Sequence, residues 1–131
     1  VGSFGIECLS RGVQEVIFIE NYSKVLPLLK KNLVSLNSIQ NYKIIEKDIY
    51  RDNIFSKLEY EFNIIFLDPP YKDKNLENIF IEIKKYKILN NNGIIIMHRH
   101  KNELDFIPSG FKLIEKKVYG ISKIIFLSYL N

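Results

Sequence analysis

The sequence predicts an α/β fold: a doubly wound, Rossmann-like sheet that is mostly parallel and ends in an antiparallel β-hairpin. Two patterns support this prediction. Short apolar runs alternate with longer amphipathic ones over residues 3–97, as in parallel strands joined by covering helices. Residues 111–119 and 122–130 read instead as two strands joined by a tight turn at Gly120. No repeat or linker is visible, so we expect a single domain over residues 1–131.

The first half predicts two helices and two strands. A helix is expected over residues 3–12, where apolar positions recur. Residues 15–20 (EVIFIE) and 42–46 predict short strands, because they are rich in β-branched and aromatic residues. Residues 22–36 predict a long helix, with Pro27 tolerated in its first turns. Its inward face is expected to consist of Val25, Leu28, Leu29, Leu33 and Leu36.

The second half continues the alternation. Residues 54–58 predict one helical turn, and residues 63–67 (NIIFL) predict a strand covered on both faces because its apolar run does not alternate. Residues 76–89 predict another helix, followed by a turn at residues 90–93 and a strand over 93–97. The inward face of this helix is expected to consist of Leu76, Ile79, Phe80, Ile83 and Tyr86.

Composition narrows the class of protein. The 131 residues are 47% hydrophobic and 26% charged, which is typical of a folded globular domain. No apolar run is long enough to cross a membrane, no signal peptide is visible, and the single cysteine cannot form an internal disulfide. We therefore expect a cytoplasmic protein, and a monomer. The net charge of +4 permits an anionic partner but is weak support in a chain so rich in lysine.

The first residues resemble part of a glycine-rich loop. Residues 1–5 (VGSFG) match the last five positions of G-x-G-x-x-G, whose glycines let the backbone approach a cofactor. Because the chain begins inside this motif, with valine, we expect that an N-terminal part including the central first strand is missing. Taken alone the motif is weak, and an incidental glycine at a helix start is the simpler interpretation.

Polar residues at the ends of the predicted strands are candidates for ligand contacts, because ligands of doubly wound sheets lie beyond the carboxyl ends of the strands. Glu20 lies 18 residues after Gly2, a spacing typical of a carboxylate that binds ribose hydroxyls. Asp48 and Ile49 follow the next strand and could contact the amino group and the ring of an adenine. The alternative for Asp48 is an Asx turn.

Asp68-Pro69-Pro70-Tyr71 is the most specific signal, because it directly follows a predicted apolar strand. The two prolines fix the backbone and remove two N–H donors. The acceptors that remain, the Asp68 carboxylate and the Pro69 carbonyl, suit an exocyclic amino group with two protons to donate. Tyr71 offers a flat face on which a base can stack. We predict that these four residues are catalytic; the alternative is a rigid turn with an exposed tyrosine.

The segments VGSFGIECLSRG, IFIE, the Asp48 turn and NIIFLDPPY, in this order, resemble a class I S-adenosylmethionine-dependent methyltransferase. More closely they resemble the bacterial 16S ribosomal RNA guanine-N2 methyltransferase family. The run over residues 5–12 narrows the resemblance, whereas D-P-P-Y is shared with DNA adenine methyltransferases. The resemblance implies S-adenosylmethionine as cofactor, and ribosomal RNA or the small ribosomal subunit as partner. The cofactor residues that it implies are Gly2, Ser3, Gly5, Glu20, Asn21, Asp48 and Ile49.

The mechanism that this resemblance implies is methyl transfer to a guanine amino group, held by Asp68 and the Pro69 carbonyl. No metal is needed, and the two histidines of the chain lack a third ligand nearby. Basic side chains after the strands, at Lys72, His98 and Arg99, are expected to contact RNA phosphates. A solvated basic loop is the alternative interpretation for these residues.

Three other functions stay open at this point. A DNA adenine-N6 methyltransferase uses the same acceptor pocket, but such enzymes usually carry an extra recognition region. A non-catalytic RNA-binding or nucleoside-binding fragment could keep the fold without activity. An NAD-binding dehydrogenase domain shares the glycines and Glu20, but has no use for an acceptor-only D-P-P-Y turn.

Overall fold

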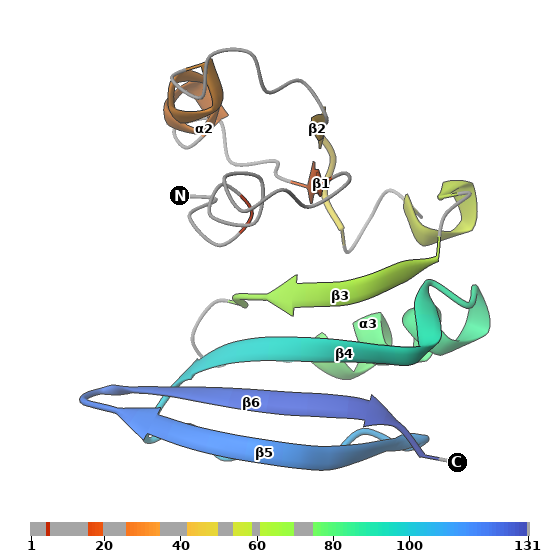
Figure 1. Ribbon diagram of the computed structural model, residues 1–131, viewed down its shortest axis with the longest axis vertical. Helices are drawn as coiled ribbons and strands as arrows, with labels where there is room; N and C mark the ends of the chain where they lie inside the picture. The colour runs from red at the N-terminus through yellow and green to blue at the C-terminus, as the bar shows by residue number, and fades with distance from the viewer. Residues whose placement is uncertain are drawn as a thin grey trace. The chain divides into compact units, whose positions relative to one another are not determined.

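The structure, a computed structural model, describes residue 5 and residues 16–19, 26–34, 42–49, 54–58, 61–69 and 75–130. The chain divides into two compact units, residues 1–54 and residues 55–131. In the described part of the chain the first unit has a two-stranded sheet and the second a four-stranded one (Figure 1). That the whole chain is one domain stays a prediction.

The first unit contains a strand–helix–strand motif. Strand β1 (Val16–Ile19) pairs in parallel with β2 (Tyr42–Ile45), and helix α2 (Leu26–Val34) lies between them in the sequence. The buried core of the unit consists of Phe18, Leu29 and Leu33. The ring of Phe18 also packs edge-on against Tyr42, with 6.5 Å between the ring centroids. The predicted alternation is therefore confirmed here.

Helix α2 buries a narrower face than the sequence predicts. Leu29 and Leu33, four residues apart, are almost completely buried, whereas Leu28 is 47% exposed. A residue adjacent to Leu29 is turned about 100° around the helix axis, which carries Leu28 out of the apolar face. The prediction that Leu28 faces inward is wrong, and Val25 and Leu36 lie outside the described residues.

The second unit contains a mixed sheet with the strand order β3-β4-β6-β5. Strands β3 (Phe62–Leu67) and β4 (Leu89–His100) are parallel. Strand β6 (Ser122–Tyr129) runs antiparallel to both β4 and β5 (Phe111–Tyr119). The predicted antiparallel hairpin is confirmed, but among the described residues it joins a mixed sheet with one parallel strand pair, so a mostly parallel, doubly wound sheet stays a prediction. The predicted helical turn is also present, as a short 3-10 helix, η1 (Ile54–Lys57).

Helix α3 (Leu76–Lys85) covers one face of this sheet (Figure 1). Its buried side chains are Leu76, Ile79, Phe80 and Ile83, as predicted, and Tyr86 is half-buried. Phe80 packs edge-on against Phe111 of β5, with 5.2 Å between the ring centroids. The sheet contributes alternate buried side chains, among them Ile95, Met97, Ile125 and Leu127. The core of the second unit therefore lies between α3 and the sheet.

The end of α3 differs from the prediction, which carried the helix to Leu89. The helix ends at Lys85, and Lys87 adopts a left-handed backbone with φ of 53°. The amide of Ile88 then donates to the carbonyl of Ile83 at 3.0 Å, which closes the helix end. Strand β4 begins at Leu89.

The predicted turn at residues 90–93 lies inside β4 as a local bulge. Phe62 of β3 pairs with Leu89, but the next paired residue, Ile64, faces Ile94. Two steps along β3 thus correspond to five along β4, so residues 90–93 leave the ladder without ending the strand.

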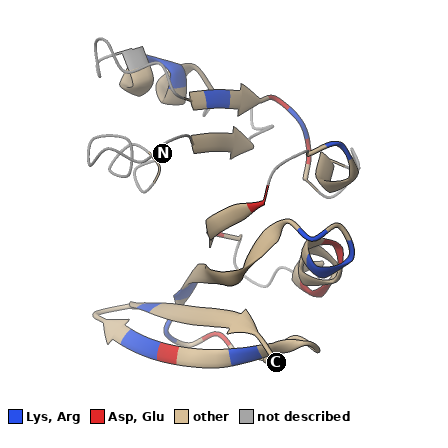
Figure 2. Ribbon diagram, turned by 45° about the vertical axis from the view of Figure 1, so that its right-hand side comes forward, with Lys and Arg blue, Asp and Glu red and all other residues tan. Residues whose placement is uncertain are grey.

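The hairpin of β5 and β6 turns at Gly120, which has a φ of 57°, and Tyr119 pairs with Ser122 across the turn. Strand β5 is the outer strand of the described sheet and carries a bulge between Leu113 and Glu115. Charged residues recur along its ribbon (Figure 2), and Lys112, Lys116 and Lys117 are exposed.

One face of β3 is partly exposed in the described part of the chain. Ile64 and Phe66, which lie on the same face of the strand, are 48% and 36% exposed. The prediction that this strand is covered on both faces is therefore wrong. No helix in the described part of the chain is long and apolar enough to cross a membrane.

Candidate functional site

The candidate site begins where β3 and β4 end side by side. Leu67 pairs with Met97, and the next residues along the two strands are Asp68 and His98. The side chain of Asp68 is 61% exposed, and Pro69 is half-buried. Because proline has no N–H, this strand end offers a carboxylate and a carbonyl, both acceptors. That these two acceptors hold an exocyclic amino group stays a prediction.

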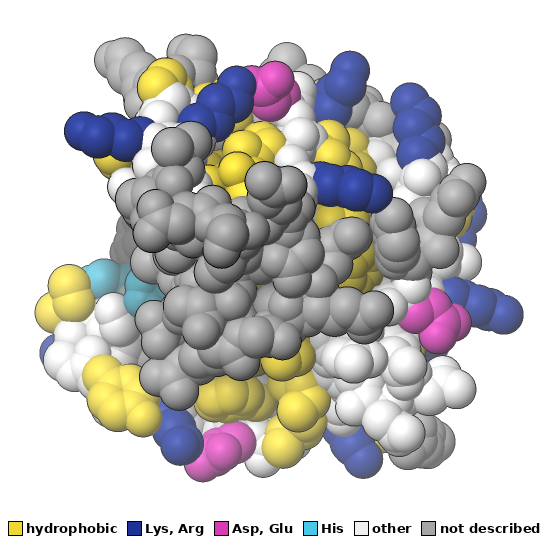
Figure 3. Space-filling model, turned by 45° about the horizontal axis from the view of Figure 1, so that its top comes forward, with side chains coloured by type: hydrophobic (Ala, Val, Ile, Leu, Met, Phe, Trp, Pro, Cys, Tyr) yellow, Lys and Arg dark blue, Asp and Glu magenta, His cyan; other side chains and the backbone are white. Residues whose placement is uncertain are grey.

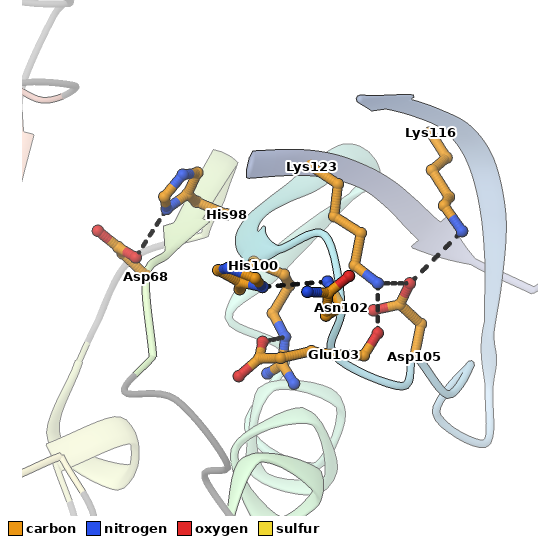
Figure 4. A network of polar contacts seen from close by, with 9 residues as sticks. Asp68, His98, His100, Asn102, Glu103, Asp105, Lys116 and Lys123 are labelled. Carbon is orange, nitrogen blue, oxygen red and sulfur yellow. Dashed lines mark hydrogen bonds and ion pairs between the residues drawn. The ribbon is translucent and has the colours of Figure 1, made fainter. Parts of the chain in front are cut away.

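His98 contacts Asp68 directly. Its Nδ1 lies 3.0 Å from Asp68 Oδ1, and its Nε2 lies 3.0 Å from Ser122 Oγ. Figure 4 shows Asp68 and His98 facing one another at the end of the sheet, and histidine side chains are visible on the face seen in Figure 3. Sequence reasoning missed both contacts, because the pairing of β4 with β3 and with β6 determines which side chains meet. That His98 contacts RNA stays a prediction.

Arg99 has a role different from the predicted phosphate contact. It lies inside β4, one residue after His98, and therefore points to the opposite face of the sheet. Its side chain is only 7% exposed, and its Nε lies 2.5 Å from Oε2 of Glu103, whose side chain is 6% exposed. A buried and paired guanidinium is not available to RNA, so the structure corrects this assignment.

The loop after β4 is held to β6 by a second buried cation. Lys123 is 3% exposed, and its Nζ lies 2.5 Å from Asp105 Oδ2 and 2.5 Å from the Glu103 carbonyl oxygen (Figure 4). Lys116 of β5 lies 3.6 Å from the same carboxylate. These contacts fix the loop on the hairpin, so we assign them to stability.

The first unit supports the predicted need for glycine at position 5. Gly5 is helical, and a Cβ placed on it would lie 2.6 Å from Phe18 Cε1 and 3.1 Å from Val16 Cγ1. Those distances are shorter than normal carbon contacts, so a residue without a Cβ fits best where the backbone at position 5 lies so close to β1. This is the close helix–strand packing expected of a glycine in a nucleotide-binding loop.

Asp48 and Ile49 lie three and four residues beyond the end of β2, and both are half-buried. The chain turns just before them, where the amide of Lys47 donates to the carbonyl of Ile45 at 3.0 Å. The adenine contact proposed for these residues stays a prediction.

Seven predicted site residues lie outside the described residues: Gly2, Ser3, Glu20, Asn21, Pro70, Tyr71 and Lys72. Their roles also stay predictions. Within the described ranges no group of three or more His, Cys, Asp or Glu side chains is arranged to hold a metal ion.

Comparison with known proteins places the chain among methyltransferases. Residues 1–128 match the family model described as "Conserved hypothetical protein 95". The chain is 32% identical over 123 residues to "Putative rRNA methyltransferase YlbH" of Bacillus subtilis, covering 92% of this chain and 67% of that protein. It is also 32% identical over 130 residues to "Ribosomal RNA small subunit methyltransferase D" of Buchnera aphidicola subsp. Baizongia pistaciae, covering 99% of this chain and 65% of the relative.

The fold agrees with these relationships. The chain superimposes on the solved structure of HI0767 from Haemophilus influenzae, described as a "putative methylase", with a TM-score of 0.79 and 28% identity. The match covers 99% of this chain and 81% of that one. From the family match, the sequence identities and the shared α/β fold, we conclude that the chain belongs to the family of S-adenosylmethionine-dependent methyltransferases that includes ribosomal RNA small subunit methyltransferase D.

Proposed function

We propose that the protein transfers a methyl group from S-adenosylmethionine to the exocyclic N2 amino group of a guanine in small-subunit ribosomal RNA. Membership of the family supports methyl transfer, and the names of the relatives support ribosomal RNA as the substrate. The observation that carries the proposal is the exposed Asp68 carboxylate at the carboxyl end of β3, followed by Pro69. The partner is ribosomal RNA or the small ribosomal subunit, in the cytoplasm.

Asp68 and Pro69 act on the amino group of the base. The lone pair of a guanine amino nitrogen is delocalised into the ring, so the nitrogen is a weak nucleophile. The Asp68 carboxylate and the Pro69 carbonyl accept hydrogen bonds from its two N–H groups and thereby orient the nitrogen. The acceleration comes from positioning and from stabilising the positive charge that develops on the nitrogen. Asp68 then takes up the proton that the methylated nitrogen releases.

The base must leave its stack to reach these acceptors. We assign Tyr71 to stacking on the extruded base and Pro70 to holding the turn rigid, and Lys72 to a phosphate nearby. Stacking of a base on an aromatic ring contributes about 1–3 kcal/mol. The half-exposed His98 lies at the same strand end as Asp68.

The cofactor residues lie in the first unit. S-adenosylmethionine, when bound, supplies an electrophilic methyl group. The close packing at Gly5 supports a glycine loop at the start of the chain, and Asp48 and Ile49 retain surface that a ligand can reach. The residues that we assign to holding the cofactor are Gly2, Ser3, Gly5, Glu20, Asn21, Asp48 and Ile49.

The test is methyl transfer by the wild-type protein and by Asp68→Asn. Small ribosomal subunits that lack the modification are incubated with tritiated S-adenosylmethionine, and the labelled nucleoside is identified by mass spectrometry. Asp68→Asn is expected to slow transfer about 10²–10³-fold, because one charged acceptor of the amino group is lost. Its affinity for S-adenosylmethionine, measured by calorimetry, should stay within about twofold of wild type.

Glu77→Gln is the matched control, since it makes the same chemical change at an exposed position of α3. It should keep both activity and binding. Full turnover by Asp68→Asn would refute the role of this carboxylate. In a parallel reaction with DNA in place of the subunits, label on adenine N6 would instead indicate a DNA methyltransferase. Cofactor binding without transfer to any nucleic acid would indicate a non-catalytic nucleoside-binding domain.

A further inference from the structure

Three polar side chains form a continuous chain of contacts across three strands. Asp68 follows β3, His98 lies on β4, and Ser122 begins β6. Both ring nitrogens of His98 are engaged, Nδ1 at 3.0 Å from Asp68 Oδ1 and Nε2 at 3.0 Å from Ser122 Oγ. His98 and Ser122 lie in the strand ladder, and Asp68 directly follows Leu67, the last paired residue of β3, so strand register brings these side chains together.

The chemistry of the three groups gives the chain a direction. An ionised carboxylate can only accept a hydrogen bond, so the proton of a neutral His98 ring lies on Nδ1 and is donated to Asp68. The other ring nitrogen, Nε2, is then an acceptor, and the Ser122 hydroxyl donates to it. The hydrogen bonds thus run in one direction: Ser122 donates to His98, and His98 donates to Asp68.

The same residue types form the nucleophilic triad of serine hydrolases, but the exposure here is reversed. In such a triad the aspartate is buried and the serine meets the substrate. In this protein the Asp68 side chain is 61% exposed, His98 is 37% exposed, and the contact with Ser122 is partly buried. The carboxylate is the exposed end of this series of hydrogen bonds, so the contacts orient Asp68 and do not activate Ser122.

We propose that His98, held by Ser122, is the positioning residue for Asp68. Its N–H engages Oδ1, prevents free rotation of an exposed carboxylate, and leaves Oδ2 to accept from the amino group of the substrate base. This inference rests on the proposed function, because it assigns a task to the same strand end. A misplacement of about 1 Å at such a group costs up to 10²-fold in rate, so a side chain that restrains the carboxylate affects turnover without touching the substrate.

The test compares His98→Leu with His98→Asn, which have nearly the same shape. Asparagine places an N–H donor at the same number of bonds from the backbone as Nδ1 of histidine, whereas leucine has no donor. In single-turnover assays on small ribosomal subunits, His98→Leu should slow methyl transfer about 10–100-fold. His98→Asn should recover most of that loss. Ser122→Ala should cause a smaller decrease than His98→Leu, because it removes only the distal donor.

His100→Leu is the matched control, since His100 lies on the same strand, two residues farther along, and accepts instead from the Asn102 amide at 3.1 Å. It should keep the wild-type rate. All variants are also compared in thermal stability and in affinity for S-adenosylmethionine, which a positioning residue leaves unchanged. Wild-type turnover by His98→Leu overturns the proposal, as does a His98→Asn rate as low as that of His98→Leu. A fall in stability or cofactor affinity that parallels the loss of rate also overturns it.

A second readout does not depend on turnover. Nitrogen-15 NMR of the His98 ring in the wild-type protein should show the proton on Nδ1, and Asp68→Leu should remove this preference. A proton on Nε2 overturns the chain of donors. A wild-type protein that transfers no methyl group contradicts the proposed function, and the NMR result then decides separately whether the hydrogen-bond chain exists.

Discussion

Glu103→Gln removes one charge from a buried ion pair and leaves the shape of the side chain unchanged. In the wild-type protein Arg99 and Glu103 are only 7% and 6% exposed, with 2.5 Å between Nε and Oε2. Arg99 Nη1 has no hydrogen-bond partner in the described part of the chain. The variant therefore leaves a guanidinium in the core with neither a counterion nor enough acceptors.

The expected loss follows from this burial. Removing one partner of a buried ion pair lowers the free energy of unfolding by about 3–5 kcal/mol. Unfolding entropy is about 2.1 cal/mol/K per residue, so each kcal/mol corresponds to about 3.6 °C for a chain of 131 residues. We therefore expect Tm to fall by about 11–18 °C, measured by circular dichroism, with urea titration giving the free energy.

Two further variants make this test specific. Glu115→Gln makes the same change in an exposed pair, 3.7 Å from Lys117, and should cost at most about 1 kcal/mol. The double variant Arg99→Met with Glu103→Leu replaces both charges by apolar groups and should be at least about as stable as wild type. If Glu103→Gln costs no more than Glu115→Gln, Arg99 is not a buried charge and the reasoning is wrong.

Three more predictions concern packing and pH. Gly5→Ala should lower the free energy of unfolding by about 1–3 kcal/mol, because the new Cβ meets Phe18. Adding Phe18→Leu to this variant should restore part of the loss. If urea titrations show that the effects of the two substitutions simply add, the contact between positions 5 and 18 is contradicted. Phe80→Ala should lower the free energy of unfolding by about 3–5 kcal/mol, since Phe80 is 1% exposed and packs on Phe111. A loss below about 1 kcal/mol would show that α3 does not pack on the sheet as described. Burial raises the pKa of Tyr129 above its usual 10.0, so its contribution to stability is full below pH 10 and is lost as the pH rises through the higher pKa of the folded state. Tyr129→Phe should therefore flatten the fall in stability above pH 10, and an unchanged slope in urea titrations would exclude this group as the cause.

Apolar periodicity was enough to predict the elements whose burial follows the sequence pattern. The positions of Leu76, Ile79, Phe80 and Ile83 repeat with the period of a helix, and all four are buried against the sheet. The hairpin follows from β-branched and aromatic residues on both sides of Gly120. In both cases local preference and tertiary packing favour the same conformation.

The end of α3 could not be predicted in this way. Ile88 and Leu89 continue the apolar pattern, so the sequence extends the helix through them. The chain instead leaves the helix at Lys87, whose left-handed backbone is uncommon for lysine. The hydrogen bond from Ile88 to Ile83 and the start of β4 compensate for this conformation, and both depend on tertiary structure.

The candidate site could be predicted only in part from the sequence, because some of its contacts depend on tertiary structure. Asp68 and Pro69 are recognisable because their neighbours form a motif. The contact of Asp68 with His98 joins residues 30 apart, and it depends on the register between two strands. Arg99 follows a histidine in a basic segment and so reads as solvated. Only its place in the strand alternation, together with an acidic partner supplied by the next loop, makes it a core residue.

The outer strand β5 affects how this protein behaves at high concentration. The free backbone edge of such a strand can template pairing with another molecule, which is a common route to aggregation. Here lysines recur along that strand, and a bulge distorts the ladder between Leu113 and Glu115. A second copy approaching edge to edge would meet hydrated charged side chains and an irregular hydrogen-bond pattern, so growth of the sheet from molecule to molecule is disfavoured at this border.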